Sequence, residues 1–188
     1  MTDKKRIAKV AVPFVIVLLV AGVWFIKNRA TVENVMVDTQ ADAAANVLAM
    51  ANDPNFTLHT EKIDLEVLSA YKLPMILDFG SVDCIPCKEM APVLETMNSE
   101  MQGKAIIRFV DVWKYTNGAD GFPVQVIPTQ VLVNAGGEPY VPGVAMDSSG
   151  IRFTMYSTKD TNEHAFTVHQ GGLTEEQMRL ILKDMGVV

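Results

Sequence analysis

The sequence predicts an α/β fold with a mixed central sheet flanked by helices, preceded by one N-terminal transmembrane helix. Short apolar runs that suit buried strands occur at 75–79, 105–112 and 129–134. Apolar residues at helical spacing occupy 84–101 and the stretch that begins at Thr174. Strands and helices therefore alternate before a strand-rich stretch and a closing helix, which is typical of a sheet with helices on both faces.

A nearly unbroken apolar run of seventeen residues extends from Val10 to Ile26. As a helix, this length is just enough to cross a bilayer core of about 30 Å. Four Lys or Arg residues precede the run and two follow closely, so the positive-inside rule places the N-terminus in the cytoplasm and the remainder outside. We expect residues 1–29 to form a cytoplasmic tip and a signal anchor in a bacterial cell membrane. A cleaved signal peptide is the rival interpretation, and it exports the domain as well.

The charge is divided between the two parts of the chain. Residues 1–29 carry six Lys/Arg and one Asp (net +5), whereas residues 30–188 carry ten Lys/Arg and twenty-one Asp/Glu (net −11). An acidic exported domain has no electrostatic reason to bind nucleic acid. Solubility is the simpler interpretation of this charge.

Capping residues and breaks in the apolar pattern predict the elements in the first half of the exported part of the chain. We expect residues 30–54 to form a juxtamembrane linker with a short alanine-rich helix over 38–51. Residues 56–63 suit a strand, and Asp64 can cap a short helix that ends near Pro74. The compact apolar strand at 75–79 follows.

The second half begins with the helix over 84–101, whose apolar positions recur at i, i+3, i+4 and i+7. Strands over 105–112 and 129–134 come next, then a glycine turn and two strands over 152–157 and 165–170. The last helix starts at Thr174, which forms a capping box with Gln177, and Gly186 ends it.

Cys84 and Cys87 are the only cysteines in the chain, and two residues separate them. A disulfide across so short a loop restricts the unfolded chain little, so its value would be chemical. Cys84 opens a helix, where the helix dipole and free backbone N–H groups favour a thiolate. Pro86 suits the first helical turn. Cys87 should be more sheltered, and could resolve a mixed disulfide that Cys84 forms.

A half zinc site is the alternative for such a pair. Zinc needs about four ligands, and the three histidines, His59, His164 and His169, have no ligand spacing relative to the cysteines. We therefore expect no metal and no other cofactor. Trp113 is interpreted as a packing residue, and Lys88 and Arg108 as solvated charges.

Asp78 lies inside an apolar strand, six residues before Cys84. Burial would raise its pKa and let the carboxylate accept a proton near Cys87. The alternative is an aspartate at the strand edge that faces water. Pro128 precedes the apolar strand at 129–134, and an Ile127–Pro128 bond is of the type in which cis peptides occur.

The segment DFGSVDCIPCKEMAPVLE resembles the active-site segment of the thioredoxin family, which runs like DFWAxWCGPCKxxAPxLE. The matching positions are Asp78, Phe79, Cys84, Pro86, Cys87, Lys88, Ala91, Pro92, Leu94 and Glu95. Ile127-Pro128-Thr129 resembles the family's cis-proline loop. The resemblance implies a thioredoxin-like fold over 55–188, with Cys84 and Cys87 as the redox pair and Asp78 as the buried acid. It also implies that Ile85, Pro86, Ile127 and Pro128 contact the substrate.

The sequence departs from the family pattern at three places. Asp83 replaces the usual tryptophan, and a carboxylate beside Cys84 disfavours its thiolate. The dipeptide between the cysteines is Ile-Pro, which makes the rim more apolar. An insertion near 138–168, with Tyr140, Asp147 and Tyr156, is either a partner-selectivity element or an inert hairpin.

The resemblance implies a protein-disulfide oxidoreductase. Because a stabilised thiolate marks the oxidants, Asp83 favours a reductant of disulfides in exported proteins. Such a reductant needs electrons from a membrane partner, which the sequence does not identify. The alternatives are a disulfide-forming oxidase or isomerase, and a binding or assembly module without turnover.

Overall fold

The computed structural model describes Trp24 and residues 53–187. The predicted transmembrane segment 10–26, apart from Trp24, and the predicted helix over 38–51 lie outside the described residues. Within the part of the chain that is described, no helix is long and apolar enough to cross a membrane.

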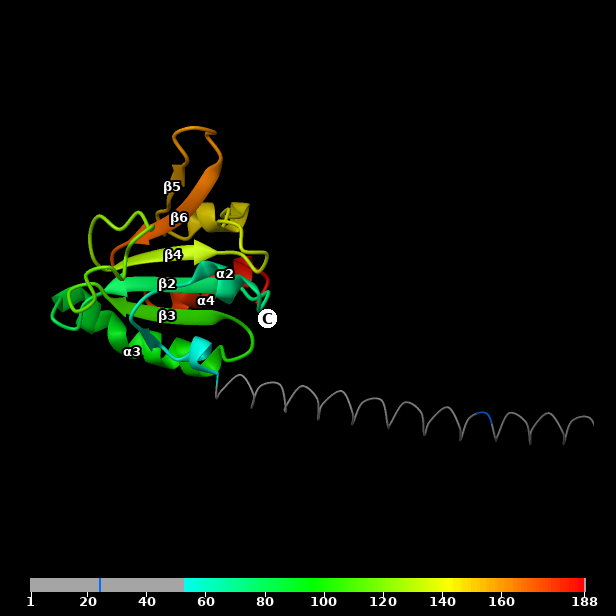
Figure 1. The fold of residues 1–188 in the computed structure, drawn as a ribbon. Coiled ribbons are helices and arrows are strands. Elements are labelled where there is room, and N and C mark those ends of the chain that lie inside the picture. Colours follow the sequence, from blue (N-terminus) through cyan, green and yellow to red (C-terminus); the bar gives the residue numbers. More distant parts are fainter. Residues whose placement is uncertain (1–23, 25–52, 188) are drawn as a thin grey trace, which may run out of the picture. The chain divides into compact units, whose positions relative to one another are not determined.

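A six-stranded sheet in the order β1-β3-β2-β4-β6-β5 forms the centre of the domain (Figure 1). The first three of these strands run parallel, and the pairs β2–β4, β4–β6 and β6–β5 are antiparallel. The predicted mixed sheet is therefore confirmed. The strands are β1 (His59–Thr60), β2 (Met75–Gly80), β3 (Ile106–Asp111), β4 (Thr129–Val133), β5 (Thr154–Ser157) and β6 (His164–Gln170).

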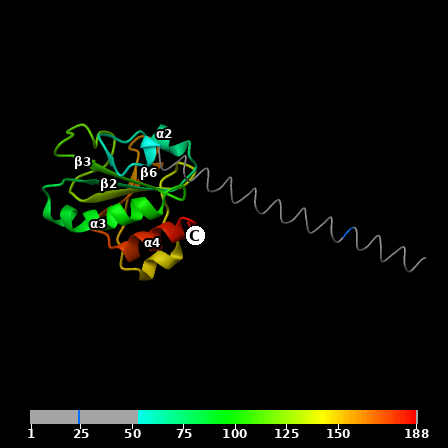
Figure 2. The ribbon, with the colours of Figure 1, turned by 90° about the horizontal axis from the view of Figure 1, so that it is seen from below.

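Helices cover both faces of the sheet, as predicted. Figure 2 shows α3 and α4 together on one side and α2 on the other. The strands alternate accordingly, because Ile76 and Leu132 join the core under α3 and α4 while Leu77 and Val131 join the opposite core. Over residues 53–187, the α-helices are α2 (Leu65–Ser69), α3 (Ile85–Glu100) and α4 (Glu175–Asp184).

The caps form where the sequence predicts them. Asp64 accepts a hydrogen bond from the backbone N–H of Val67 at 3.1 Å and starts α2. Thr174 Oγ1 accepts from Gln177 N at 3.2 Å, while Gln177 Oε1 accepts from Thr174 N at 2.9 Å, which completes the capping box of α4. Local sequence therefore fixes where these helices begin.

The predicted strand over 56–63 is wrong in extent, since only His59–Thr60 pairs with β3. A 3-10 turn, η1 (Pro54–Phe56), precedes it and is capped by Asp53. Arg108 donates to the carbonyls of Pro54 at 3.1 Å and Asn55 at 2.6 Å. This side chain is therefore buried, and its interpretation as a solvated charge is wrong.

Trp113 does not pack in the core, because 60% of it is exposed. It follows β3 in a tight turn, where the Asp111 carboxylate accepts its backbone N–H at 3.1 Å. This turn directs the indole outward, so its interpretation as a packing residue is wrong.

The segment over 138–168 contains η2 (Val144–Ser148), β5 and the start of β6. The sequence analysis did not predict the 3-10 helix η2. Tyr140, at the root of this segment, is buried and donates to Asp184 Oδ2 in α4 at 2.6 Å. The root of the insertion is thus fastened to the last helix.

Candidate active site

A disulfide joins Cys84 and Cys87, whose Cα atoms lie 5.3 Å apart. Cys84 is the N-cap residue of α3 and has an extended backbone, while Pro86 lies in the first turn. The Cys84 carbonyl accepts from Lys88 N at 3.0 Å, which begins the helical ladder. The predicted placement of the pair at a helix N-terminus is confirmed.

The two sulfur-bearing residues differ little in exposure. Cys84 is 7% exposed and Cys87 is 4% exposed, so the expected contrast between an open and a sheltered cysteine is small. In the disulfide, each sulfur covers part of the other. The surface in front of the pair instead belongs to Ile85, which is 72% exposed, and to the exposed Pro86.

Asp111, at the end of β3, forms hydrogen bonds that fix the loop that carries Cys84. Its carboxylate accepts backbone N–H groups of Val82, Trp113 and Lys114, each at 3.1 Å. Burial alone would raise the pKa of Asp111, but these bonds and one from Ser81 together lower it. Asp111 is therefore ionised, and as a clamp it links the loop before Cys84 to the turn after β3 through hydrogen bonds.

Asp78 lies in the middle of β2 and is 1% exposed. The predicted burial is confirmed, and the alternative of a strand-edge aspartate is wrong. Burial raises the pKa of this carboxyl to about 7, against a hydrogen bond from Gln130 that lowers it. A group with this pKa can accept and return a proton near neutral pH.

Gly80 separates the Asp78 carboxyl from the Cys87 sulfur. A Cβ atom at Gly80 would lie 3.2 Å from Cys87 Sγ, 3.4 Å from Asp78 Oδ2 and 3.0 Å from a ring carbon of Phe109. The sulfur and the carboxyl therefore face the same small space. Both groups lie close to one point in this space, which places them within reach of a single bridging water.

The peptide bond between Ile127 and Pro128 is cis, as predicted. Thr129 pairs with Phe79 across β4 and β2, so Pro128 lies one residue further, opposite Gly80, at the end of the sheet that carries the cysteines. Within residues 53–187, the backbone N–H and C=O of Ile127 have no hydrogen-bond partner. They are free to pair with an extended substrate, which is the role the resemblance implies.

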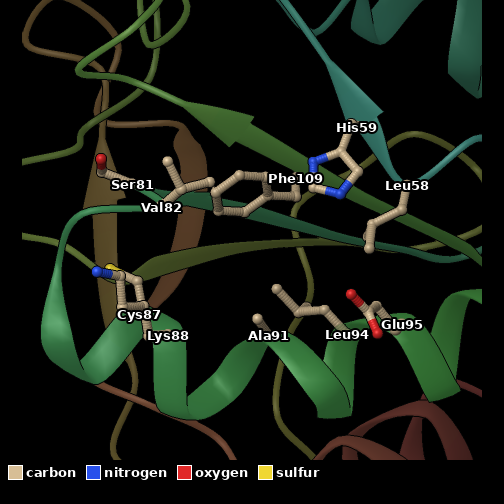
Figure 3. A pocket seen from close by; sticks show the side chains of 10 residues that line it. All are labelled: Leu58, His59, Ser81, Val82, Cys87, Lys88, Ala91, Leu94, Glu95 and Phe109. Atoms are coloured by element: carbon tan, nitrogen blue, oxygen red, sulfur yellow. The ribbon is translucent and has the colours of Figure 1, made fainter.

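A small open pocket of about 140 Å³ lies behind the disulfide, between α3 and the strands β1 and β3. Figure 3 shows Cys87, Ala91 and Leu94 of α3 facing His59 and Phe109 across it. The described residues, including those that line this pocket, hold no group of three or more possible metal ligands.

The sequence analysis missed two polar residues of the site. Gln130 contacts Asp78 from β4, and Asp111 holds the active-site loop. A glutamine within the apolar strand at 129–134 was a visible signal, equivalent to Asp78 in its own strand, but its partner depends on the strand register.

The thioredoxin family model matches residues 54–150. Thioredoxin 2 of Chlorobaculum tepidum is 31% identical over 86 residues, which cover 46% of this chain and 72% of that protein. Thioredoxin C-2 of Corynebacterium nephridii is 36% identical over 76 residues, covering 40% of this chain and 69% of that protein.

The bifunctional thioredoxin reductase/thioredoxin of Mycobacterium leprae is 35% identical over 116 residues, covering 60% of this chain but 25% of that protein. Among solved structures, chloroplastic thioredoxin z is similar, with 21% identity, a TM-score of 0.44, and coverage of 70% of this chain and 98% of that one. The family match, which extends over more than half of the chain and includes both cysteines and the cis-proline, shows that the chain belongs to the thioredoxin family.

Proposed function

We propose that this protein reduces disulfides of exported proteins by dithiol–disulfide exchange through Cys84 and Cys87. Its thioredoxin relatives are protein-disulfide oxidoreductases, which supports the general class. The observation that carries the proposal is the Cys84–Cys87 disulfide at the start of α3, with Asp78 behind it and cis Pro128 at the same end of the sheet.

The reaction begins with the reduced pair. The Cys84 thiolate attacks one sulfur of the substrate disulfide, and the other substrate sulfur leaves as a thiolate that takes up a proton. Asp78 accepts the proton of Cys87, whose sulfur then attacks Cys84 Sγ and releases the second substrate thiolate. Two electrons pass from the protein to the substrate, and the Cys84–Cys87 disulfide is formed.

Substrate binding uses the exposed rim around the pair. Ile85 and Pro86 offer an apolar surface beside the sulfur, and the free backbone groups of Ile127 can pair with an extended segment of substrate next to Pro128. This arrangement suits a polypeptide substrate, because it recognises backbone as well as side chains.

Asp83 supports the reducing direction. It directly precedes Cys84 and is exposed, and its carboxylate opposes a thiolate at the helix N-terminus. An oxidant gains its strength from a stabilised thiolate in the reduced form. The membrane anchor at 10–26, the extracytoplasmic location and the electron-donating membrane partner belong to the same proposal.

Trapping the mixed disulfide tests the proposal directly. Full-length Cys87→Ser protein, expressed with its N-terminal segment, should accumulate disulfide-linked adducts of exported proteins on Cys84. The matched control, Cys84→Ser, should accumulate none. An empty trap would favour a binding module, and a redox potential near that of strong oxidants, measured against glutathione, would reverse the direction.

A further inference from the structure

Gln130 is the only polar side chain of the described residues that forms a hydrogen bond with the Asp78 carboxyl. Its Nε2 atom donates to Asp78 Oδ1 at 2.6 Å. The two residues are directly opposite each other in the antiparallel pair β2–β4, so both side chains emerge on the same face of the sheet. Gln130 is fully buried.

The other neighbours of Asp78 are apolar or uncharged. From β3, the residue paired with Asp78 is Phe109. From α3 come the Cys87 sulfur, which does not titrate in the disulfide, and Met90, whose Sδ accepts from Gln130 at 3.5 Å. The charged Lys88 and Glu89 of α3 are exposed. Among the described residues, no charge contributes to the pKa of Asp78, which burial raises and Gln130 lowers.

Two histidines continue the same row of paired residues. His59 pairs with Phe109 on one side, and His169 of β6 pairs with Gln130 on the other. His169 Nδ1 lies 2.9 Å from the Arg152 carbonyl, to which it must donate. His169 is thus the titratable group that faces Gln130 from β6.

Core packing does not explain the amide of Gln130. Its Oε1 atom is buried and has no partner within the described residues, and such an orphan acceptor destabilises the folded state. Leucine has a similar size and would fill the site without this loss. A buried polar group of this kind calls for a role other than stability.

We propose that Gln130 is a positioning residue that sets the proton affinity of Asp78, and through it the pH at which Cys87 resolves the mixed disulfide. Its N–H donates to the ionised carboxylate and stabilises that form. Without this bond, burial alone would keep the carboxyl protonated at neutral pH, and it could not accept the Cys87 proton. The kinetic part of this inference rests on the proposed function, whereas the effect on the carboxyl does not.

The experiment observes the carboxyl first. In the oxidised protein the sulfurs do not titrate, so the carbon-13 signal of the Asp78 carboxyl reports its ionisation alone. The Asp78 carboxyl of the wild-type protein should titrate with a midpoint at about pH 7. In Gln130→Leu the midpoint should rise by roughly one to two pH units, the scale of a hydrogen bond to a charged group. Gln130→Met replaces it if Gln130→Leu does not fold.

Gln102 offers a matched control. It also carries a buried Oε1 without a partner in the described region, but it lies past the far end of α3, and its Nε2 donates to the Phe56 and Asn98 carbonyls. Gln102→Leu and His169→Asn should leave the Asp78 midpoint unchanged. An unchanged midpoint in Gln130→Leu, or an equal shift in His169→Asn, would overturn the inference.

The second measurement follows resolution. Reduced protein is mixed with Ellman's reagent, and the second release of thionitrobenzoate reports the attack of Cys87 on the adduct at Cys84. The midpoint of this rate against pH should rise in Gln130→Leu by the same amount as the carboxyl midpoint. A shift of the carboxyl midpoint without a shift of the rate would support the effect of Gln130 on Asp78. It would overturn the effect of Gln130 on resolution, and with it the role of Asp78 in the proposed mechanism.

Discussion

Asp78 and Asp111 are both buried carboxyls near the active-site disulfide, yet their surroundings differ. Asp78 lies under the pair, on the face covered by α3, and has one hydrogen-bond donor, the Gln130 amide. Asp111 lies at the end of β3 and accepts one backbone N–H group from the loop before Cys84 and two from the turn that follows β3. Their pKa values move in opposite directions, up to about 7 for Asp78 and down for Asp111.

The depth of burial and the number of donors together separate the two carboxyls, since Asp78 is 1% exposed with one donor and Asp111 is 7% exposed with three backbone donors. Both lose water on folding, which disfavours their charged forms. Three backbone donors compensate Asp111 and keep it ionised, so it serves as a fixed clamp. One donor leaves Asp78 near the point where its proton can leave or return, as a proton acceptor requires.

The largest effect is expected for Asp78→Asn. This variant tests the comparison between Asp78 and Asp111 through the pH dependence of the free energy of unfolding. Because the folded-state pKa of Asp78 is raised from 3.8 to about 7, the wild-type protein loses stability as pH rises through this range. The asparagine variant avoids that loss. Its free energy of unfolding should exceed that of wild type by about 4 kcal/mol at pH 8 and by little at pH 3. Urea unfolding of the oxidised proteins measures this, and an equal difference at both pH values would contradict it.

Asp111→Ala should change the free energy of unfolding in the opposite direction. It removes the acceptor of three backbone N–H groups, so the free energy of unfolding should fall by about 3 kcal/mol at neutral pH. Since the folded-state pKa is lowered, the contribution of Asp111 is present above its unfolded pKa and is lost as pH falls through the folded value. Urea unfolding should therefore show the loss shrinking in acid.

Asp111→Asn is the milder comparison for this clamp. Its side-chain oxygen can still accept from part of the loop, so it should lose less stability than Asp111→Ala. A larger loss in the asparagine variant would contradict the account of Asp111 as an acceptor of backbone hydrogen bonds.

Gly80→Ala probes the space between Asp78 and Cys87. The added Cβ would lie 3.0 Å from Phe109, 3.2 Å from Cys87 Sγ and 3.4 Å from Asp78 Oδ2. Overpacking of this kind should lower the free energy of unfolding by about 1–2 kcal/mol, and it should slow resolution of the mixed disulfide. Stopped-flow release of thionitrobenzoate measures the rate.

Gly172→Ala is the matched control, because a Cβ there meets nothing within 4 Å. It should change neither the stability nor the resolution rate. Equal slowing in both alanine variants would show that the space at Gly80 has no role in proton transfer.

Apart from the glycine control, Thr174→Ala has the smallest expected effect, and it lies away from both carboxyls. Removing the cap of α4 should lower the free energy of unfolding by about 1 kcal/mol. The midpoint of the resolution rate against pH should not move. A moved midpoint would show that the pH dependence reports general loosening of the domain rather than Asp78.

Local patterns predicted most of the fold. The apolar strands at β2, β3 and β4 and the capping box at Thr174 depend on neighbours in sequence, and all are confirmed. The strand expected over 56–63 shrank to two residues because Asp53 caps a 3-10 turn just before it. Arg108 donates a hydrogen bond to the carbonyl of Asn55 in that turn. The two residues are 53 positions apart in the sequence, so no local pattern reveals this contact.

The site divides in the same way. The cysteine pair, the buried Asp78 and cis Pro128 could be predicted, because a short motif and its resemblance to a family carry them. Gln130 and Asp111 could not, because their roles depend on the strand register that sets Gln130 opposite Asp78 and on the loops that converge on Asp111.

The central claim is that Asp78 accepts the Cys87 proton when the mixed disulfide is resolved. It is tested most directly by the rate of resolution against pH in wild type and in Asp78→Asn, whose side chain has no carboxyl to titrate. The account predicts a midpoint near 7 in wild type, which is lost in the variant together with a slower rate at neutral pH. The same midpoint and the same rate in both proteins would contradict it.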